Sequence, residues 1–275
     1  MSNIKSFEWV LENIDNPNVR IFDCRFQLHD PAAGAKLYTE EHLPNAFYMD
    51  LEKDLSSEIQ EHGGRHPLPD IQKLTEKLSR LGVDDLVTVV AYDDQNGAMA
   101  SRLWWLMKYL GHEDVFVLNG NFSSWKEQGL PLDTAISAIK RRNFHPSIQK
   151  HIVASVEDVK AKLDNPQTIL IDSREPNRYL GIEEPIDKIS GHIPGAVNYF
   201  WQESFENGLW KNQAHLEKRF QNIPKDKEVI VYCGSGVTAC PNILSLKEAG
   251  YENVLLYAGS WSDWITYSDN PISSK

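Results

Sequence analysis

Residues 228–259, EVIVYCGSGVTACPNILSLKEAGYENVLLYAG, contain a strand, a loop, a helix and a second strand. Short apolar runs at 229–232 and 254–257 are flanked by turn residues, a pattern typical of buried parallel strands. Between them, a loop with two glycines leads into a helix that we expect from Thr238 to Gly250. Cys233 lies where the first strand meets this loop. The stretch predicts an α/β unit whose loop lies at the carboxyl end of the sheet, where such folds bind ligands.

Strand and helix patterns alternate along the rest of the chain. We expect strands at 19–26, 87–92, 115–120, 168–175, 228–233 and 254–259, and helices at 70–82, 98–111, 215–222 and 238–250. Parallel strands need crossover connections, and these are usually helices. The pattern therefore predicts an α/β fold with parallel sheets that are covered by helices on both faces.

The second half of the chain repeats the first half. The matching segments are 109–132 with 248–271, 23–26 with 172–175, and 41–50 with 191–200. Their offset of about 140 to 150 residues is one domain length, which indicates a duplication. We expect an N-terminal domain at 1–136, a linker at 137–154 and a C-terminal domain at 155–275.

Composition excludes several classes of function. The chain of 275 residues has 28 Lys and Arg against 39 Asp and Glu, a net charge of −11, so we expect no nucleic-acid and no membrane partner. Three cysteines without a signal-peptide pattern argue against a disulfide framework and favour a cytoplasmic protein. The C-x6-C spacing has no paired histidines and is not a zinc pattern, so we expect no metal and no cofactor.

Cys233 is the strongest candidate for a catalytic residue. When the halves are aligned, YDDQNGAMA (92–100) matches YCGSGVTAC (232–240), and Asp93 stands in the place of Cys233. The loop glycines allow backbone N–H groups to turn inward beside the amino end of a helix, which favours a thiolate or another anion. We therefore expect a catalytic C-terminal domain and a non-catalytic N-terminal domain. The alternative is a buried structural thiol.

The remaining cysteines and one basic run have less specific interpretations. Cys240 falls in the first turns of the helix after the loop, where we expect packing, with a redox role toward Cys233 as the alternative. Cys24 lies in a predicted core strand and is expected to be structural. The basic run at 140–142 is expected to be a solvated stretch of the linker, with an anion site as the alternative.

The loop CGSGVTA (233–239), the motif GHIPGAVN (191–198) and the segment DSREPNRYLG (172–181) resemble the tandem rhodanese-like sulfurtransferases over nearly the whole chain. That family includes thiosulfate and 3-mercaptopyruvate sulfurtransferases. The resemblance implies two tandem rhodanese-like domains, each a parallel sheet flanked by helices on both faces. It also implies that Cys233 takes sulfur from a small anionic donor and holds it as a persulfide. The acceptor would be cyanide or a thiol, either a small thiol or a thioredoxin-like protein.

The loop also bears on the choice of donor. Thiosulfate enzymes generally carry cationic side chains where this chain has Gly234 and Ser235, so the resemblance is to the mercaptopyruvate type. It implies that Ser235 and His66, in GGRHPLPD (63–70), are catalytic and relay a proton. A loop histidine that only caps or packs is the alternative for His66. The residues expected to bind the substrate around the sulfur are Gly234, Gly236, Val237 and Thr238.

Arg178 matches the family arginine that holds the anionic end of the donor, because a guanidinium grips a carboxylate with two parallel bonds. The alternative is a salt bridge within the sequence neighbourhood. The nearby carboxylates are Glu183, Glu184 and Asp187.

The chain departs from the mercaptopyruvate pattern in two places. A second arginine is usual between residues 182 and 190, where this chain has only Lys188. The acidic residue that orients the histidine is usually an aspartate, and the matches here are Glu52 and Asp54. Thiosulfate:cyanide sulfurtransferase (rhodanese) activity and a non-enzymatic persulfide carrier are therefore the alternatives. A cysteine phosphatase is disfavoured because Ala239 stands where its arginine would be.

Overall fold

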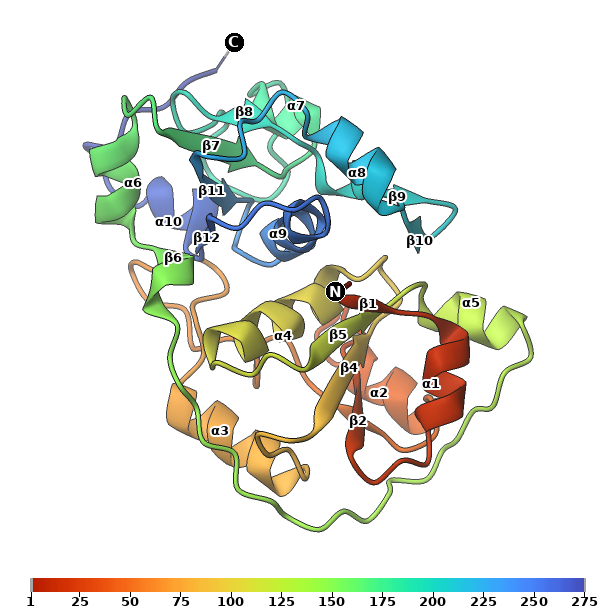
Figure 1. Cartoon of the computed structure of the whole chain (residues 1–275). Helices are drawn as coiled ribbons and strands as arrows, with labels where there is room; N and C mark the ends of the chain where they lie inside the picture. Colours follow the sequence, from red (N-terminus) through yellow and green to blue (C-terminus); the bar gives the residue numbers. More distant parts are fainter. Residues whose placement is uncertain (1, 275) are drawn as a thin grey trace. The chain divides into compact units, whose positions relative to one another are not determined.

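The structure is a computed structural model in which residues 2–274 are described. The chain forms two compact units (Figure 1). The first unit comprises the residues up to Ser57, Pro69–Gln149 and Asn207–Trp210, and the second comprises Glu58–Leu68, Lys150–Glu206 and the residues from Lys211 onward. A short segment of the first half, Glu58–Leu68, therefore belongs to the second unit.

The first unit is built on a five-stranded parallel sheet with the order β1-β5-β4-β2-β3. Its strands are β1 Ile4–Lys5, β2 Val19–Asp23, β3 Ala46–Tyr48, β4 Thr88–Tyr92 and β5 Val115–Leu118. Its helices are α1 Phe7–Asn13, α2 Ala33–Glu40, α3 Ile71–Arg80, α4 Ala98–Tyr109 and α5 Phe122–Glu127. All five residues of β2 are buried, as expected for a parallel strand that is covered on both faces.

The second unit repeats this design, with a parallel sheet in the order β6-β12-β11-β7-β8. Its strands are β6 Val153–Ala154, β7 Thr168–Asp172, β8 Val197–Asn198, β11 Glu228–Tyr232 and β12 Val254–Tyr257. Its helices are α6 Val156–Lys162, α7 Pro176–Tyr179, α8 Gln213–Arg219, α9 Ala239–Glu248 and α10 Ser260–Trp264, with 3-10 turns at η1 Lys150–Ile152 and η2 Trp201–Ser204. A further short strand of this unit is β9 Phe205–Glu206, whereas β10 Leu209–Trp210 falls in the segment Asn207–Trp210 of the first unit. The expected α/β fold is confirmed.

Buried side-chain interactions show the duplication in detail. In the first unit Arg25 Nη2 pairs with Asp23 Oδ2 at 2.7 Å, and in the second Arg174 Nη2 pairs with Asp172 Oδ2 at 2.6 Å. Two tryptophans at matching positions also make the same contact. The indole N–H of Trp125 donates to Pro131 O, and the indole N–H of Trp264 donates to Pro271 O, both at 2.9 Å. The two halves therefore share buried polar contacts as well as strand order.

The sequence predicted every long strand, but the ends of the strands differ from the expected ones. The strand expected at 19–26 ends at Asp23, because the side chain of Arg25 turns back to pair with Asp23. Cys24 therefore follows β2 directly instead of lying in it, and it is buried. The last two residues of the expected linker, Val153 and Ala154, form β6 of the second sheet.

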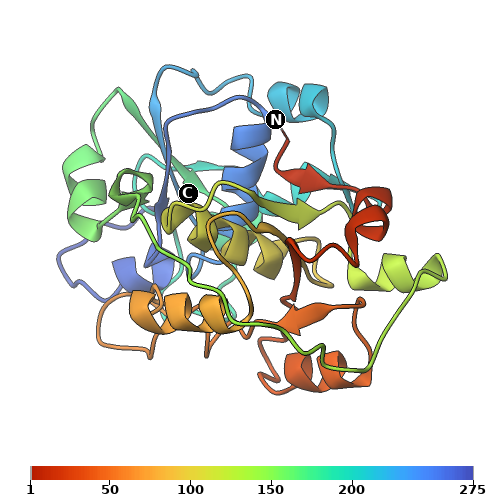
Figure 2. The same ribbon diagram turned by 60° about the horizontal axis from the view of Figure 1, so that its bottom comes forward.

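The segment from residue 136 to residue 149, which has no helix or strand, runs alongside α3 in both ribbon views (Figure 1 and Figure 2). Arg142 N donates to Ser79 O at 3.0 Å, which fixes the segment to the end of this helix. In the basic run, Arg141 pairs with Glu76, and Arg142 pairs with Asp84. Two of the three cations therefore have carboxylate partners inside the first unit.

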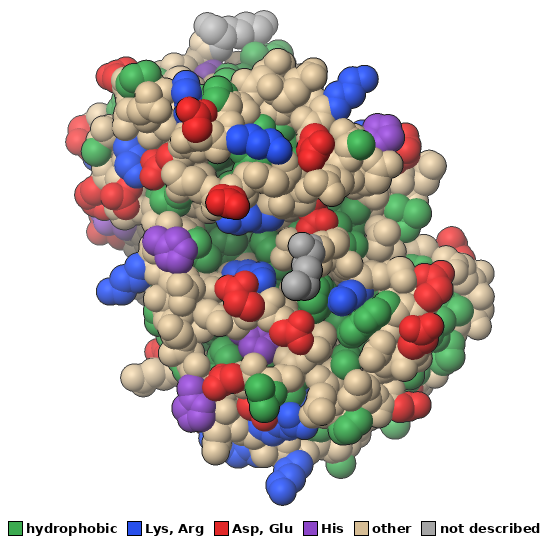
Figure 3. All heavy atoms as spheres, viewed as in Figure 1, with side chains coloured by type: hydrophobic (Ala, Val, Ile, Leu, Met, Phe, Trp, Pro, Cys, Tyr) green, Lys and Arg blue, Asp and Glu red, His purple; other side chains and the backbone are tan. Residues whose placement is uncertain are grey.

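Acidic and basic side chains are interspersed on the face shown in Figure 3. Among the residues described there, no continuous basic patch is visible. Within residues 2–274, no helix is both long and apolar enough to cross a membrane.

Asp93, which stands in the place of Cys233, fills the anion position of the first unit. One carboxylate oxygen accepts the N–H groups of Gln95 and Gly97, both at 2.8 Å. The other accepts those of Met99 at 2.7 Å and Ala100 at 2.9 Å. Burial raises the pKa of Asp93, and these four backbone bonds act in the opposite direction. The loop between a strand and a helix in this fold thus gathers N–H groups around a negative charge.

We expect Asp93→Ala to destabilise the first unit by at least about 3 kcal/mol, because it leaves four buried N–H groups without an acceptor. Urea-induced unfolding followed by circular dichroism measures the loss as a lower midpoint. The matched control is Asp94→Ala, which removes an exposed carboxylate that bonds Ser123, and it should cost about 1 kcal/mol or less. Equal midpoints for both variants would contradict this account of Asp93.

Candidate active site

Cys233 follows the central strand β11 directly and is 1% exposed. The Gly236 N–H donates to Cys233 Sγ at 3.2 Å, so the loop turns a backbone donor toward the sulfur. The loop itself is held by α10: Cys233 N donates to Ser260 Oγ at 3.1 Å, and Trp261 N donates to Cys233 O at 3.0 Å. The site therefore presents a thiol with a hydrogen-bond donor already aimed at it, which suits a thiolate or a persulfide anion.

Gly236 must be glycine for two reasons. Its φ of 77° lies in the left-handed region, and a Cβ atom there would lie 2.1 Å from the carbonyl oxygen of Ala258. Ser260, whose hydroxyl bonds Cys233 N, also has a left-handed φ of 57°. Glycine adopts this conformation without strain, whereas the left-handed backbone of Ser260 costs energy, as is frequent beside functional sites.

The segment Glu58–Leu68 brings two more side chains to this loop. It binds α10 through its backbone, since Gly63 N donates to Asp263 Oδ1 at 2.7 Å and Arg65 N donates to Ser262 Oγ at 3.1 Å. Gly64 has a φ of 78°, and a Cβ atom on it would lie 2.3 Å from Gly259 O. Only a glycine lets the segment approach α10 this closely, and the approach fixes the next two residues, Arg65 and His66.

His66 and Ser235 are in direct contact. His66 Nδ1 lies 2.8 Å from Ser235 Oγ, and the two side chains are 5% and 7% exposed. Ser235 is two residues after Cys233, so the imidazole is linked to the loop through a hydroxyl. The structure thus brings together three residues that the sequence predicted to be catalytic.

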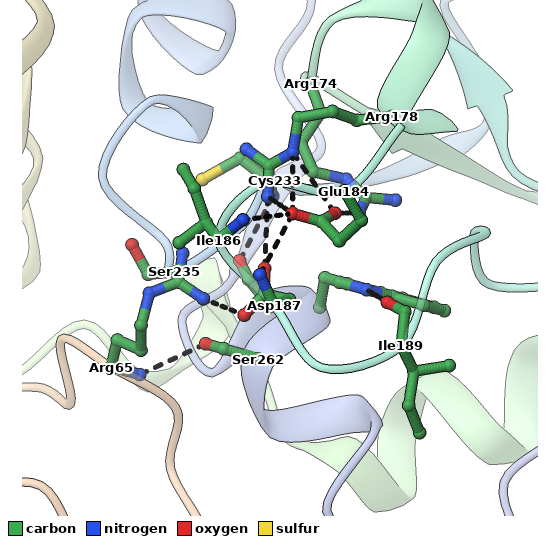
Figure 4. A network of polar contacts seen from close by, with 12 residues as sticks. Arg65, Arg174, Arg178, Glu184, Ile186, Asp187, Ile189, Cys233, Ser235 and Ser262 are labelled. Atoms are coloured by element: carbon green, nitrogen blue, oxygen red, sulfur yellow. Dashed lines mark hydrogen bonds and ion pairs between the residues drawn. The ribbon is translucent and has the colours of Figure 1, made fainter. Parts of the chain in front are cut away.

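Arg178, at the end of α7, has carboxylate partners (Figure 4). Its Nε and Nη2 bind Glu184, with Nη2 at 2.7 Å from Oε1, and Nη2 also lies 3.1 Å from Asp187 Oδ2. Glu184 also pairs with Arg174 at 3.2 Å. The salt bridge that the sequence offered as the alternative for Arg178 is therefore present, and two of the three nearby carboxylates take part in it.

Arg65 is a site residue that the sequence reasoning missed. Its Nη1 pairs with Asp187 Oδ1, so Asp187 bridges Arg65 and Arg178 with one oxygen for each (Figure 4). A Cβ atom on Gly234 would lie 2.9 Å from Arg65 Nη2. The signal in the sequence was the pair of glycines before Arg65, which indicates a close backbone approach next to a candidate histidine.

Other residues named from the sequence lie outside this cluster. Lys188 and Glu52 are exposed. The Asp54 carboxylate accepts the Asp50 N–H at 2.8 Å and pairs with Lys77 in the first unit. The Cys240 thiol is buried and donates to Gly236 O at 3.4 Å, so it packs under the loop. Burial raises the pKa of the Cys24 thiol well above its ordinary value.

Two of the loop residues expected to bind the substrate, Val237 and Thr238, differ in their hydrogen bonds. The Val237 carbonyl accepts the Cys240 N–H at 3.0 Å, and Thr238 is the N-cap of α9 without a side-chain cap bond. Among residues 2–274, no cluster of three or more His, Cys, Asp or Glu side chains has the arrangement of a metal site.

The family follows from comparison with known proteins. The rhodanese-like domain matches this chain twice, at residues 6–128 and 155–267. The chain belongs to the rhodanese-like sulfurtransferases. The two matches cover the two halves of this sulfurtransferase, and the tandem arrangement expected from the internal repeat is confirmed.

Similar proteins span the whole rhodanese tandem. A Pseudomonas aeruginosa protein named "Probable 3-mercaptopyruvate sulfurtransferase" is 39% identical over 95% of this chain and 94% of its own length. A rat protein named thiosulfate sulfurtransferase is 32% identical over 94% of this chain and 91% of its own. The crystal structure of SseA from Escherichia coli has a TM-score of 0.84 and 30% identity, covering 95% of this chain and 100% of that one. The protein is a sulfurtransferase, as predicted, and sulfur transfer requires a sulfur donor and an acceptor such as a thiol.

We expect Gly236→Ala to reduce sulfur loading of the enzyme by at least about tenfold, because the left-handed backbone and the contact with Ala258 cannot both be kept. The readout is the rate at which the cysteine peptide gains sulfur in a mass spectrum. Gly129→Ala is the matched control, since Gly129 has a φ of 67° but nothing within 4 Å of a Cβ atom. If the two variants lose the same activity, steric contact at residue 236 is not what shapes the loop.

Proposed function

We propose that this sulfurtransferase takes its sulfur from 3-mercaptopyruvate. The observation that carries the proposal is the 2.8 Å contact between His66 Nδ1 and Ser235 Oγ beside Cys233. Cleavage of mercaptopyruvate leaves an enolate, which needs a proton, and a histidine linked to a serine is suited to supply one. The name of the Pseudomonas aeruginosa relative agrees with this donor.

In the proposed first step, the Cys233 thiolate attacks the sulfur of the donor. A sulfur–sulfur bond forms, the donor's carbon–sulfur bond breaks, and the electron pair stays on carbon as the enolate of pyruvate. Ser235, supplied by His66, protonates that carbon. The proton of the donor thiol stays with the outer sulfur or is released to solvent, and the enzyme holds a persulfide.

The loop backbone stabilises the sulfur during this step. Gly236 N–H is aimed at Sγ in the structure, and we propose that Gly234, Val237 and Thr238 contribute the remaining groups around the outer sulfur. Arg178 would hold the donor carboxylate, because its Nη1 has no hydrogen-bond partner among the described residues.

In the second step, an acceptor thiolate attacks the outer sulfur, and Cys233 leaves as a thiolate. We propose a small thiol or a thioredoxin-like protein as the acceptor, with cyanide as an artificial one. Cytoplasmic localisation remains a proposal that rests on the three free cysteines. The domain limits of 1–136 and 155–275 with a linker at 137–154 are also a proposal, except that the second domain begins by Val153, because Val153 and Ala154 form β6 of its sheet. The non-catalytic role of the first domain is a further proposal.

Mass spectrometry of the protein after exposure to each donor tests the nucleophile. We expect the peptide that contains Cys233 to gain one sulfur, about 32 Da, from 3-mercaptopyruvate, and Cys233→Ala to gain none. Sulfur on Cys240 or Cys24 in that variant would contradict the assignment.

Steady-state kinetics with a thiol acceptor tests the donor. We expect pyruvate release from 3-mercaptopyruvate to have a higher kcat/KM than sulfite release from thiosulfate. Equal or higher thiosulfate activity would favour rhodanese activity, and loading without turnover would favour a persulfide carrier.

We expect His66→Asn and Ser235→Ala each to lower kcat with 3-mercaptopyruvate by about 100-fold, the usual contribution of a positioned acid. Loading from thiosulfate should fall much less, because sulfite leaves without needing a proton on carbon. His215→Asn, which changes an exposed histidine on α8, is the control and should keep full activity. An equal loss with both donors would mean that the pair shapes the loop instead of moving a proton.

A further inference from the structure

We propose that a cavity at the amino end of the first unit's sheet is a binding site for a phosphate group, carried by free phosphate or by a small phosphate ester. The cavity has a volume of about 640 Å³, and the residues that line it all belong to the first unit. They include four cations and one carboxylate: Arg20, Lys140, Arg141, Arg142 and Asp84. Such a site goes beyond sulfur transfer and does not depend on which sulfur donor the enzyme uses.

Arg20 places this cavity at the opposite end of the sheet from the Asp93 loop. It is the second residue of β2, where it is in register with Val89 of β4. Asp93 follows the carboxyl end of β4. Because these strands are parallel, the cavity lies away from the position at which this fold gathers N–H groups around an anion.

Arg20 is a buried cation, only 5% exposed, with no carboxylate of the described residues within ion-pair distance. Its Nε donates to Leu81 O at 3.2 Å, and its Nη1 donates to Pro17 O at 3.1 Å and to Val19 O at 2.7 Å. These partners are all backbone carbonyl groups. Within residues 2–274, Arg20 Nη2 has no hydrogen-bond partner, and since Arg20 lines the cavity, this group is available to a ligand there.

Two other buried arginines show what Arg20 lacks. Arg25 and Arg174 each pair with the aspartate two residues before them. A buried charge is costly unless a counter-charge and hydrogen bonds satisfy it. Carbonyl oxygens bind Arg20 on one side only, so an anion from solution is the partner that its unbonded side can take.

The segment from residue 136 to residue 149 brings further cations to the cavity (Figure 2). Arg142 is fixed there, since its Nη1 pairs with Asp84 at 3.2 Å. Lys140 is exposed, and its ammonium group has no hydrogen-bond or ion-pair partner in the described part of the chain. An anion that binds Arg20 and Lys140 together links β2 to this segment.

The charges at the cavity match those of a phosphate group. Asp84 and Glu76 offset the charges of the two paired arginines of the segment. Two cations, Arg20 and Lys140, are left without a carboxylate partner among residues 2–274. A phosphate ester carries a charge of about −1.5 to −2 near neutral pH and has three strong acceptor oxygens. Charge-assisted hydrogen bonds to such oxygens are strong.

The electrostatics of Arg20 agree with this assignment. Burial lowers the pKa of Arg20, and the charge of Arg142 lowers it further, whereas the charge of Asp84 raises it. Arg20 and Arg142 are thus close enough to repel each other. A bound anion offsets this repulsion. The cavity is therefore a local concentration of positive charge on a chain whose net charge is −11.

A second cavity, of about 250 Å³, adjoins the first. The two share Pro17, Arg20 and Ile139 in their linings. The second cavity also has apolar residues, which include Ile14, Val19 and Phe47. An organic group attached to the phosphate can therefore lie beside Arg20 on an apolar surface.

Hydrogen exchange followed by mass spectrometry tests the site on the full chain. The readout is the peptide that covers residues 137–145, in which the Arg142 N–H donates to Ser79 O and the Phe144 N–H donates to Ser79 Oγ. Phosphate that holds the segment against β2 should slow the exchange of these amides. A peptide readout also separates this site from any binding of phosphate near Cys233.

In the wild type we expect phosphate to slow exchange of this peptide saturably, by about tenfold at ten times its dissociation constant. Sodium chloride at the same ionic strength should leave the exchange unchanged. Arg20→Gln removes the buried guanidinium, and Lys140→Glu reverses the exposed charge. Each should raise the half-saturating phosphate concentration by at least about tenfold, which corresponds to the loss of one charge-assisted hydrogen bond. Lys36→Glu, on α2 and outside both cavities, is the matched control for the change of charge and should behave as wild type.

Phenyl phosphate distinguishes an ester from free phosphate, because its ring can enter the second cavity. A half-saturating concentration at least about fivefold below that of inorganic phosphate identifies an ester as the kind of ligand, since burial of apolar surface adds to binding. An equal or higher concentration identifies free phosphate. Either result supports a phosphate site at Arg20.

Three results would overturn the site. If phosphate leaves the wild-type peptide unchanged, Arg20 serves only to bind the carbonyl groups at the end of α3. If sodium chloride slows exchange equally, the effect is one of general salt. If saturation is unchanged in Arg20→Gln or in Lys140→Glu, phosphate binds elsewhere. Circular dichroism shows whether each variant is folded, and Lys140→Glu alone decides should Arg20→Gln unfold.

Discussion

Backbone N–H groups that turn toward one point after a strand favour a negative charge there, and each unit of this protein places an acceptor at that point. In the first unit it is the Asp93 carboxylate, which accepts four N–H groups. The second unit places the Cys233 sulfur at the matching point, with the Gly236 N–H directed at it. A carboxylate occupies the position in the first unit, whereas a sulfur occupies it in the second, and sulfur is the atom that the proposed persulfide chemistry needs. In that proposal the same fold yields a non-catalytic domain and a catalytic one.

The sequence predicted the parts of the structure that depend on local pattern. The strands β4, β7, β11 and β12 are apolar runs with turn residues at their ends, and each was found within a few residues. The comparison of Asp93 with Cys233 identified matching positions in the two halves, one with a carboxylate and one with a thiol. Strands of two residues, such as β6, were missed because two residues cannot show a period.

The arrangement of the site depended on contacts that the sequence does not display. The segment Glu58–Leu68 lies far from α10 in sequence, and it reaches that helix because Gly64 can approach Gly259 O closely. The contact of His66 with Ser235 was expected from family resemblance alone. Arg65 was overlooked because an arginine in a loop has no distinctive spacing, and its bridge to Arg178 through Asp187 needs three separate segments to meet.

The absence of a side chain at Gly234 has a consequence for how donor preference can change during evolution. Any side chain at residue 234 must displace the end of Arg65, whose Nη2 would lie 2.9 Å from the new Cβ atom. A cation carried by the loop and a cation carried by residue 65 therefore compete for the same volume. Because the end of an arginine side chain can move, a side chain at residue 234 is accommodated by a shift of the Arg65 guanidinium. Substitutions at residues 65 and 234 are therefore expected to have non-additive effects.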